Sequence, residues 1–129
     1  MVGGYSVIIH GYSRNTRDLD LWVKPMEKNY QKLYEAFHNF GMTVFYMVLP
    51  KFLDINNFNV FTFGRSPVSI EILTKVKGLI FDEMNAKSIY FEDEDLRVRL
   101  INFNDLINAK KAAGRSRDLN DIEQLNKVK

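Results

Sequence analysis

The sequence predicts a mixed α+β fold in which helices pack on a mixed β-sheet. Segments with the two-residue alternation of strands are mixed along the chain with segments whose apolar residues recur at helical spacing. Some neighbouring strand segments are close enough to form hairpins, and helices separate the others, which favours a mixed sheet. With 129 residues and no repeat, linker or low-complexity tract, the chain is expected to form one domain over residues 1–129.

The first elements surround a polar loop. Residues 5–12 fit a short helix, although the run Val7-Ile8-Ile9 fits a strand equally well. Residues 13–17 are polar and predict a loop. The polar–apolar alternation of residues 18–24 then predicts a strand, which Pro25 ends.

A longer helix follows. Apolar and aromatic residues recur at helical spacing over residues 27–40, and Gly41 is a good helix stop. Residues 42–49 are expected to form a strand. Residues 50–57 are expected to form a short turn or helix.

The remaining strands form two pairs. Residues 58–63 and 67–73 are strand segments joined by the turn signal at 64–67. Residues 87–92 and 96–101 alternate like the two arms of a hairpin.

Three helices complete the second half of the chain. The first is a short helix over residues 79–86. Asn102 can cap a second helix over 103–113, which Gly114 ends. The third covers residues 116–127.

The bulk composition limits the functional classes. A net charge of +2 is too small to indicate nucleic acid by itself. The absence of cysteine excludes disulfides, a thiolate nucleophile and a cysteine zinc site, and fits the reducing cytoplasm. No apolar run reaches the length of a membrane span, and no signal-peptide pattern opens the chain, so no membrane partner is expected.

Carboxylates provide the first candidate site. Asp18 and Asp20 lie two residues apart on a predicted strand, so their side chains share one face and can bind two Mg²⁺ ions. Glu71 lies between two isoleucines of another strand and is the best candidate for orienting and activating an acceptor hydroxyl. If that strand is central, an ionised carboxylate there is costly without a cation. Each feature alone is better explained by an exposed strand residue or an ion pair, so the interpretation rests on their combination.

Groups that favour anions lie at both ends of the chain. Gly3 and Gly4 permit close approach of backbone N–H groups to a ligand, although a plain tight turn explains them too. Arg14 and Arg17 are either phosphate ligands or solvated side chains.

The C-terminal segment adds a lysine and two aspartates. Lys110 lies near the end of one predicted helix, and Arg115 lies in the turn to the next. Asp118 and Asp121 are three residues apart on the last helix and share a face. Lys110 can neutralise phosphate, with an aspartate positioning Lys110, Arg115 or the acceptor. Helix capping and surface ion pairing are the alternative explanation.

Three segments together resemble the polymerase-beta-like nucleotidyltransferase superfamily, in its small prokaryotic branch related to abortive-infection toxin nucleotidyltransferases. The first runs from Gly3-Gly4 to Asp18-Leu19-Asp20. The second, residues 63–73, contains Glu71. The third, residues 105–121, contains Lys110, Arg115, Asp118 and Asp121. The resemblance covers nearly the whole chain, and its motifs occur in the right order.

The resemblance implies a nucleotidyltransferase fold that transfers a nucleoside monophosphate from an NTP to a hydroxyl acceptor and releases pyrophosphate. The acceptor is an RNA end such as tRNA, a protein or a small molecule, and the enzyme is a candidate toxin with an antitoxin partner or a homo-oligomeric state. Asp18, Asp20 and Glu71 would bind Mg²⁺ or Mn²⁺, and Lys110 would join them in catalysis. The implied nucleotide ligands are Gly3, Gly4, Arg14, Thr16, Arg115, Asp118 and Asp121.

Two departures from the family leave other functions open. The family usually has aspartate where this chain has Glu71, and it has a helix and strand before the glycine pair, which this chain is expected to lack. A catalytically inactive binding or interaction module that keeps the fold is therefore the alternative. A third hypothesis is an RNA-binding domain that uses the basic cluster at 110–117.

Overall fold

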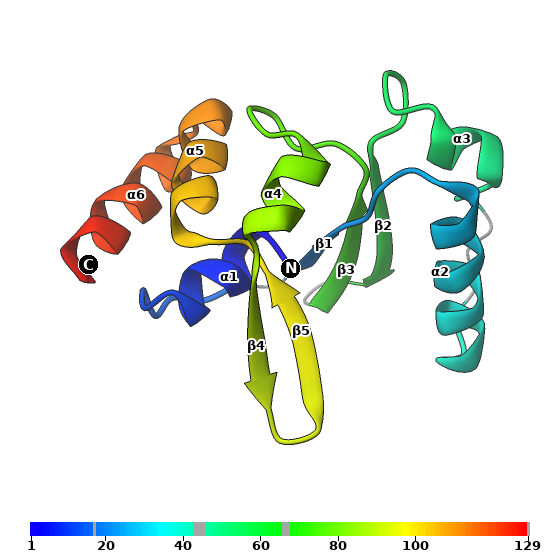
Figure 1. Ribbon diagram of the computed structural model, residues 1–129, viewed down its shortest axis with the longest axis horizontal. Coiled ribbons are helices and arrows are strands. Elements are labelled where there is room, and N and C mark those ends of the chain that lie inside the picture. The colour runs from blue at the N-terminus through cyan, green and yellow to red at the C-terminus, as the bar shows by residue number, and fades with distance from the viewer. Residues whose placement is uncertain (17, 43–45, 66–67, 129) are drawn as a thin grey trace.

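The computed structural model describes residues 1–16, 18–42, 46–65 and 68–128 (Figure 1). This part of the chain is mixed α+β, as predicted, and contains six helices and two small sheets. In chain order the elements are α1 (Gly3–Ile9), β1 (Asp18–Trp22), α2 (Glu27–Asn39), α3 (Leu49–Leu53), β2 (Val60–Arg65), β3 (Val68–Leu73), α4 (Phe81–Lys87), β4 (Ile89–Asp93), β5 (Leu96–Leu100), α5 (Phe103–Ala113) and α6 (Ser116–Val128).

The larger sheet has the strand order β1-β3-β2. β1 runs parallel to β3, and β2 pairs with β3 antiparallel, so the sheet is mixed, as expected. Successive side chains of a strand point to opposite faces. The sheet therefore separates two apolar clusters, one on each side.

The first cluster fills the space between the sheet and the pair α2 and α3, on the right of Figure 1. Phe61, Phe63 and Ile72 point from β2 and β3 toward Phe37 of α2 and Phe52 of α3, and all five are buried. Burial of such side chains contributes about 1.5–3 kcal/mol each. This face of the sheet is therefore occupied by closely packed apolar side chains, and the candidate carboxylates belong to the other face.

The second cluster joins the sheet to α1, α4, α5 and α6. Val7, Trp22, Leu106 and Leu125 are among its buried members, and each comes from a different element. Trp22 lies at the end of β1, so this cluster supports that end of the strand. The preceding part of the same strand face carries Asp18 and Asp20, and Asp20 pairs with Val2 at the start of α1.

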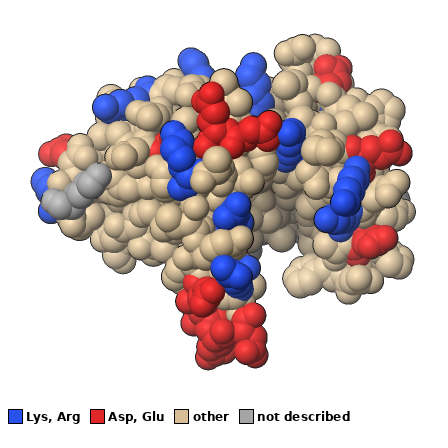
Figure 2. Space-filling model, in the orientation of Figure 1, with Lys and Arg blue, Asp and Glu red and all other residues tan. Residues whose placement is uncertain are grey.

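The β4–β5 hairpin projects from the body of the molecule (Figure 1). Its tip is acidic, as the red atoms at the bottom of Figure 2 show, and comprises residues 92–95. The N-terminal ammonium group holds the base of the hairpin by donating to the carbonyl oxygen of Arg99 at 2.8 Å. The N–H of Ile101 in turn donates to the carbonyl of Met1 at 3.1 Å.

Most elements lie where the sequence places them, with one clear error. Met42 and residues 46–48 belong to no strand, and Leu49 begins α3, so the strand expected over 42–49 is wrong in its described part. Residues 43–45 of that prediction lie outside the described residues. Buried Met47 packs in the cluster below α2, so the apolar run reflects a buried connection instead of a strand.

Local signals at α5 are confirmed. Asn102 caps α5 by accepting a hydrogen bond from the N–H of Asp105 at 2.9 Å. Gly114 ends the helix with a φ of +66°. Across the described residues, none of the helices is long and apolar enough to cross a membrane.

Candidate functional site

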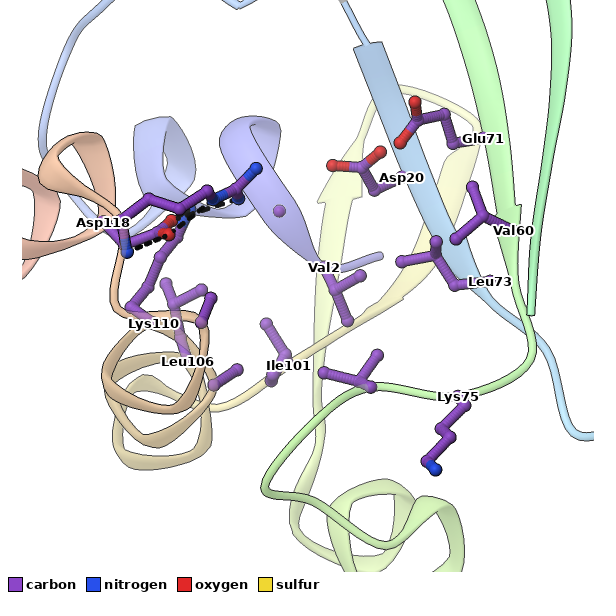
Figure 3. A pocket seen from close by; sticks show the side chains of 15 residues that line it. Val2, Asp20, Val60, Glu71, Leu73, Lys75, Ile101, Leu106, Lys110 and Asp118 are labelled. Atoms are coloured by element: carbon purple, nitrogen blue, oxygen red, sulfur yellow. Dashed lines mark hydrogen bonds and ion pairs between the residues drawn. The ribbon is translucent and has the colours of Figure 1, made fainter. Parts of the chain in front are cut away.

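Three acidic side chains share one face of the larger sheet. The parallel register of β1 and β3 places Asp18 beside Ser69 and Asp20 beside Glu71. Residues paired in this way point to the same face, so the three predicted carboxylates are on one side of the sheet. Glu71 lies in the central strand, as the sequence analysis considered. Figure 3 shows Asp20 and Glu71 pointing into one cavity.

Asp20 has a strongly raised pKa, at about 7. Burial is the largest cause, followed by a side-chain hydrogen bond with Glu71 and by the negative charges of Glu71 and Asp18. The positive charge of Lys110 lowers the pKa of Asp20 and so partly offsets these effects. The Oδ1 atom of Asp20 is buried and has no donor among the described residues, whereas Asp18 accepts a hydrogen bond from the Ser69 hydroxyl. At neutral pH, a proton on Asp20 or a cation bound beside it would relieve the repulsion among the three carboxylates.

Gly3 and Gly4 bring the start of α1 against these side chains. A Cβ atom on Gly3 would lie 1.9 Å from Oδ2 of Asp20, and one on Gly4 would lie 2.4 Å from Oγ1 of Thr16. The N–H of Val2 donates to the carbonyl of Asp20 at 3.0 Å and fixes this approach. The glycine pair therefore permits close contact, as predicted, and the groups that it contacts in this structure are the side chains of Asp20 and Thr16. Its contact with phosphate stays a prediction.

Replacing Gly3 with alanine is expected to reduce the free energy of unfolding by about 3 kcal/mol, measured by urea denaturation. Gly3 has a φ of +70°, which costs an L-residue about 1–2 kcal/mol. The added methyl group also overlaps Asp20. Gly41→Ala is the matched control, because Gly41 has a φ of +82° but, among the described residues beyond its chain neighbours, no atom lies within 4 Å of its Cβ position. Equal losses in the two variants would contradict the close contact.

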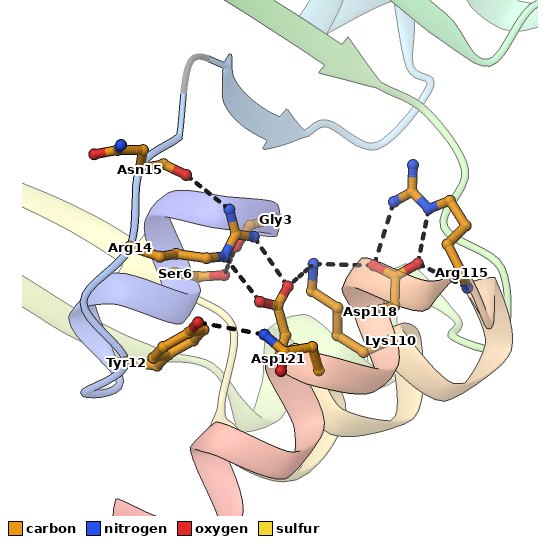
Figure 4. A network of polar contacts seen from close by, with 10 residues as sticks. Gly3, Ser6, Tyr12, Arg14, Asn15, Lys110, Arg115, Asp118 and Asp121 are labelled. Carbon is orange, nitrogen blue, oxygen red and sulfur yellow. Dashed lines mark hydrogen bonds and ion pairs between the residues drawn. The ribbon is translucent and has the colours of Figure 1, made fainter.

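Across the cavity from Asp20 and Glu71 lie Lys110 and Asp118 (Figure 3). They belong to a chain of alternating charges, which Figure 4 shows. Arg14 donates a hydrogen bond from Nη2 to Oδ2 of Asp121 at 2.9 Å, and its Nε atom forms an ion pair with Oδ1 of Asp121 at 2.8 Å. Arg17, the other predicted phosphate group of this loop, lies outside the described residues. The Nζ atom of Lys110 lies 3.1 Å from Asp121 and 3.3 Å from Asp118. Arg115 completes the chain with its Nε atom 2.7 Å from Asp118. The loop after α1 is thereby tied to α5 and α6.

The two aspartates of this network are fully buried, and the Lys110 side chain is 8% exposed. Burial acts to raise the pKa of Asp118, but the hydrogen bond from Arg115 and the charge of Lys110 outweigh it and lower that pKa. Asp118 and Asp121 therefore position cations, which is the role that the sequence analysis gave one of them. The basic cluster at 110–117 is not a single surface, because Lys110 is buried and ion-paired.

Two adjoining cavities lie between the carboxylates and this network. The smaller, of about 230 Å³, is polar and contains most of the predicted phosphate-binding groups. The larger, of about 370 Å³, begins at Asp20 and Glu71 and continues between apolar side chains (Figure 3). Both cavities are lined by Gly3, Asp20, Lys110 and Arg115.

The structure brings the predicted site residues together. Asp18, Gly4, Arg14 and Thr16 line the smaller cavity, and Glu71 lines the larger one. Asp118 lines the larger cavity, whereas Asp121 is attached to the site through Arg14 and Lys110. Among the described residues, no group of three or more His, Cys, Asp or Glu side chains forms a preassembled metal cluster.

Three further residues contribute to the site and were not predicted from the sequence. Ser69 binds Asp18, and its position two residues before Glu71 could have indicated that it shares the carboxylate face. Arg117 lines the smaller cavity and was noticed only as part of a basic cluster. Lys75 lines the larger cavity, but it follows β3 in a loop where the sequence carries no recognisable signal.

Comparison with protein-family models, with curated proteins and with solved structures finds no match to this chain.

Proposed function

We propose that the protein is a nucleotidyltransferase of the polymerase-beta-like kind, which uses Mg²⁺ or Mn²⁺ to move a nucleoside monophosphate from an NTP to a hydroxyl acceptor. One observation carries the proposal. Three carboxylates from two paired strands lie beside the glycine pair and face a fixed lysine across two adjoining cavities. This arrangement brings acidic groups that suit a metal beside basic groups that suit phosphates.

The carboxylates supply oxygen donors for the metal, but among the described residues they do not form a group of three ligands, so waters would complete the coordination of a bound ion. Mg²⁺ prefers oxygen ligands, and the buried Oδ1 of Asp20 has no donor among the described residues. Asp18, Asp20 and Glu71 would hold the ion. When bound, it would neutralise negative charge on the carboxylates and on the reacting phosphate.

The proposed reaction is an in-line displacement at the α-phosphorus. The acceptor oxygen bonds to that phosphorus, the bond to the bridging oxygen breaks, and pyrophosphate leaves. Glu71 takes the proton of the acceptor hydroxyl. Lys110, which Asp118 and Asp121 hold in place, supplies a fixed positive charge beside the triphosphate.

The smaller cavity is the proposed triphosphate site. It contains Arg14, Arg115 and Arg117 in addition to Lys110, so cations outnumber its two aspartates. Arg14 is held by Asp121, whereas the side chain of Arg115 is 64% exposed and has room to contact a ligand. The hydroxyl of Thr16 adds a neutral donor beside Gly4.

The biological setting is proposed from the resemblance alone. The candidate acceptors are an RNA end such as tRNA, a protein and a small molecule. A cytoplasmic toxin of a toxin–antitoxin pair is the proposed context, with an antitoxin or a second copy of the chain as partner.

Titration calorimetry with NTP tests the proposal. The wild-type protein is expected to bind NTP in Mg²⁺ and to lose at least about 10-fold in affinity in EDTA. The double variant Asp18→Ala/Asp20→Ala is expected to lose the gain that Mg²⁺ gives, so that its affinity in Mg²⁺ falls to the level that wild type shows in EDTA. Asp93→Ala/Asp95→Ala is the matched control, because it removes two exposed aspartates of the same spacing from the hairpin tip. Absence of wild-type binding, or equal binding by the site variant, would refute the proposal.

The second candidate is a nucleotide-binding module without turnover. It is favoured by the contact between Asp20 and Glu71, in which the longer side chain of Glu71 meets its neighbouring carboxyl group. Such a module would bind NTP with metal but release no labelled pyrophosphate when offered cellular RNA and protein. Labelling of any acceptor would exclude it. Binding of RNA that weakens steeply with salt and needs no nucleotide would instead support the RNA-binding hypothesis.

A further inference from the structure

The larger cavity has an apolar part that the proposed chemistry does not use. We call it the apolar alcove. Its walls are formed by Val60, Leu73, Val76, Leu106, Ala109 and Ala113. They come from β2, the end of β3, the loop after β3, and α5. Figure 3 shows Leu73 and Leu106 on opposite sides of this space, with Asp20 and Glu71 at one end.

We propose that the apolar alcove binds the base of the NTP while the smaller cavity binds its triphosphate. This inference rests on the proposed nucleotidyltransferase function. The two cavities meet at Gly3, Asp20, Lys110 and Arg115, which line both of them. A nucleotide bridging the two would therefore place its α-phosphate at the carboxylates, between the base and the leaving pyrophosphate.

The chemistry of the walls favours a base over the acceptor. Aliphatic side chains suit the faces of a flat aromatic ring, and pockets of a few hundred Å³ are typical of small-molecule sites. A nucleic-acid acceptor needs several cations for its phosphates. Three cations line the larger cavity among the described residues: Lys75, Lys110 and Arg115. Lys110 and Arg115 are paired with Asp118 and also line the smaller cavity, which leaves Lys75 alone for an acceptor.

The alcove would recognise a base mainly by contact with its faces. Lys75 is exposed and offers hydrogen-bond donors only, so it can bind the ring nitrogen or carbonyl acceptors that every base carries. Hydrophobic pockets discriminate weakly between ligands of similar shape. The inferred ligand class is therefore a nucleoside triphosphate with little selection for the base edge.

Ala109→Leu tests this assignment, because it adds bulk to the alcove from a half-buried position on α5. Calorimetry in Mg²⁺ compares NTP with inorganic tripolyphosphate, which has no base. The variant is expected to bind NTP at least about 10-fold more weakly and to bind tripolyphosphate within about twofold of wild type. Ala113→Leu is a second variant with the same expected result. It adds bulk to the alcove from an exposed position, where the substitution does not endanger folding.

Ala36→Leu is the matched control, since it makes the same change on the exposed side of α2, away from both cavities. Unchanged NTP affinity in both alcove variants would overturn the assignment and place the base elsewhere. Equal loss for NTP and tripolyphosphate would also overturn it, because the change would then act on the phosphate site. If wild-type protein binds neither ligand, the proposed function itself fails.

Discussion

Replacing Lys110 with methionine is expected to reduce the free energy of unfolding by about 3 kcal/mol, as measured by urea denaturation at pH 7. The Nζ atom of Lys110 lies within 3.3 Å of Asp118 and Asp121, and both aspartates are fully buried. Removing one partner of a buried ion pair typically costs about 3–5 kcal/mol, because the remaining charge is left without compensation. We expect the lower end, about 3 kcal/mol, since Arg14 and Arg115 still contact the aspartates.

Lys111→Met is the matched control for this prediction. It makes the same change one residue later, at an exposed position, and is expected to alter the free energy of unfolding by less than about 0.5 kcal/mol. The pKa of Asp118 is lowered in the folded protein, so the stability that it contributes is present at neutral pH and is lost as the pH falls through that pKa. The difference in the free energy of unfolding between wild type and Lys110→Met should therefore become smaller below about pH 4. Similar losses in both variants would contradict a buried network.

The site could be predicted because its residues lie in segments with strong local signals. The alternation of residues 18–24 and 67–73 fixes which side chains share a face, so one correct strand assignment places Asp18, Asp20 and Glu71 together once the strands pair. The pairing of these two strands cannot be predicted from the sequence pattern. The parallel register of β1 and β3 joins segments that α2, α3 and β2 separate in the sequence, and this contact forms only in the tertiary fold.

The remaining features depend on tertiary contacts that local patterns do not encode. The apolar run at 42–49 has the composition of a strand, but the burial of Met47 below α2 is satisfied without a sheet partner in the described residues. Arg14 is ambiguous in the sequence because its partner, Asp121, lies 107 residues away. The apolar alcove likewise gathers side chains from separate elements, so it has no signature within any one of them.

Replacing Asp20 with asparagine is expected to weaken metal-dependent NTP binding and, at the same time, to stabilise the metal-free protein. The substitution removes a proposed metal ligand, and changes even to outer partners of metal ligands cost roughly 10–100-fold in affinity. We expect a loss of roughly 10-fold or more by calorimetry in Mg²⁺, and no loss beyond the one that EDTA causes in wild type. It also removes a charge that burial, Glu71 and Asp18 disfavour, and an asparagine amide can donate to Glu71.

The gain in stability should depend on pH in a defined direction. The pKa of Asp20 is about 7 in the folded protein and about 3.8 without the surrounding structure. Between these values the folded state keeps a proton that the unfolded state loses, so wild-type stability falls as the pH rises through this window. The asparagine side chain of the variant cannot titrate, and the stability difference in favour of Asp20→Asn should grow from about pH 4 to pH 7 and then level off. Because Asp20 is partly solvent-exposed, we expect a plateau of about 1–2 kcal/mol.

Thermal and urea unfolding of both proteins in EDTA, at pH values from about 4 to 8, measures this difference. Asp82→Asn is the control, because Asp82 is an exposed carboxylate paired with Lys24 on the surface, and its removal should change stability little at any of these pH values. Adding Mg²⁺ should reverse the order and stabilise wild type over Asp20→Asn, since the ion binds only the folded carboxylates. A variant that is less stable than wild type in EDTA at the alkaline end of this range would show that Asp20 serves the fold, and the case for a metal ligand at this position would be lost.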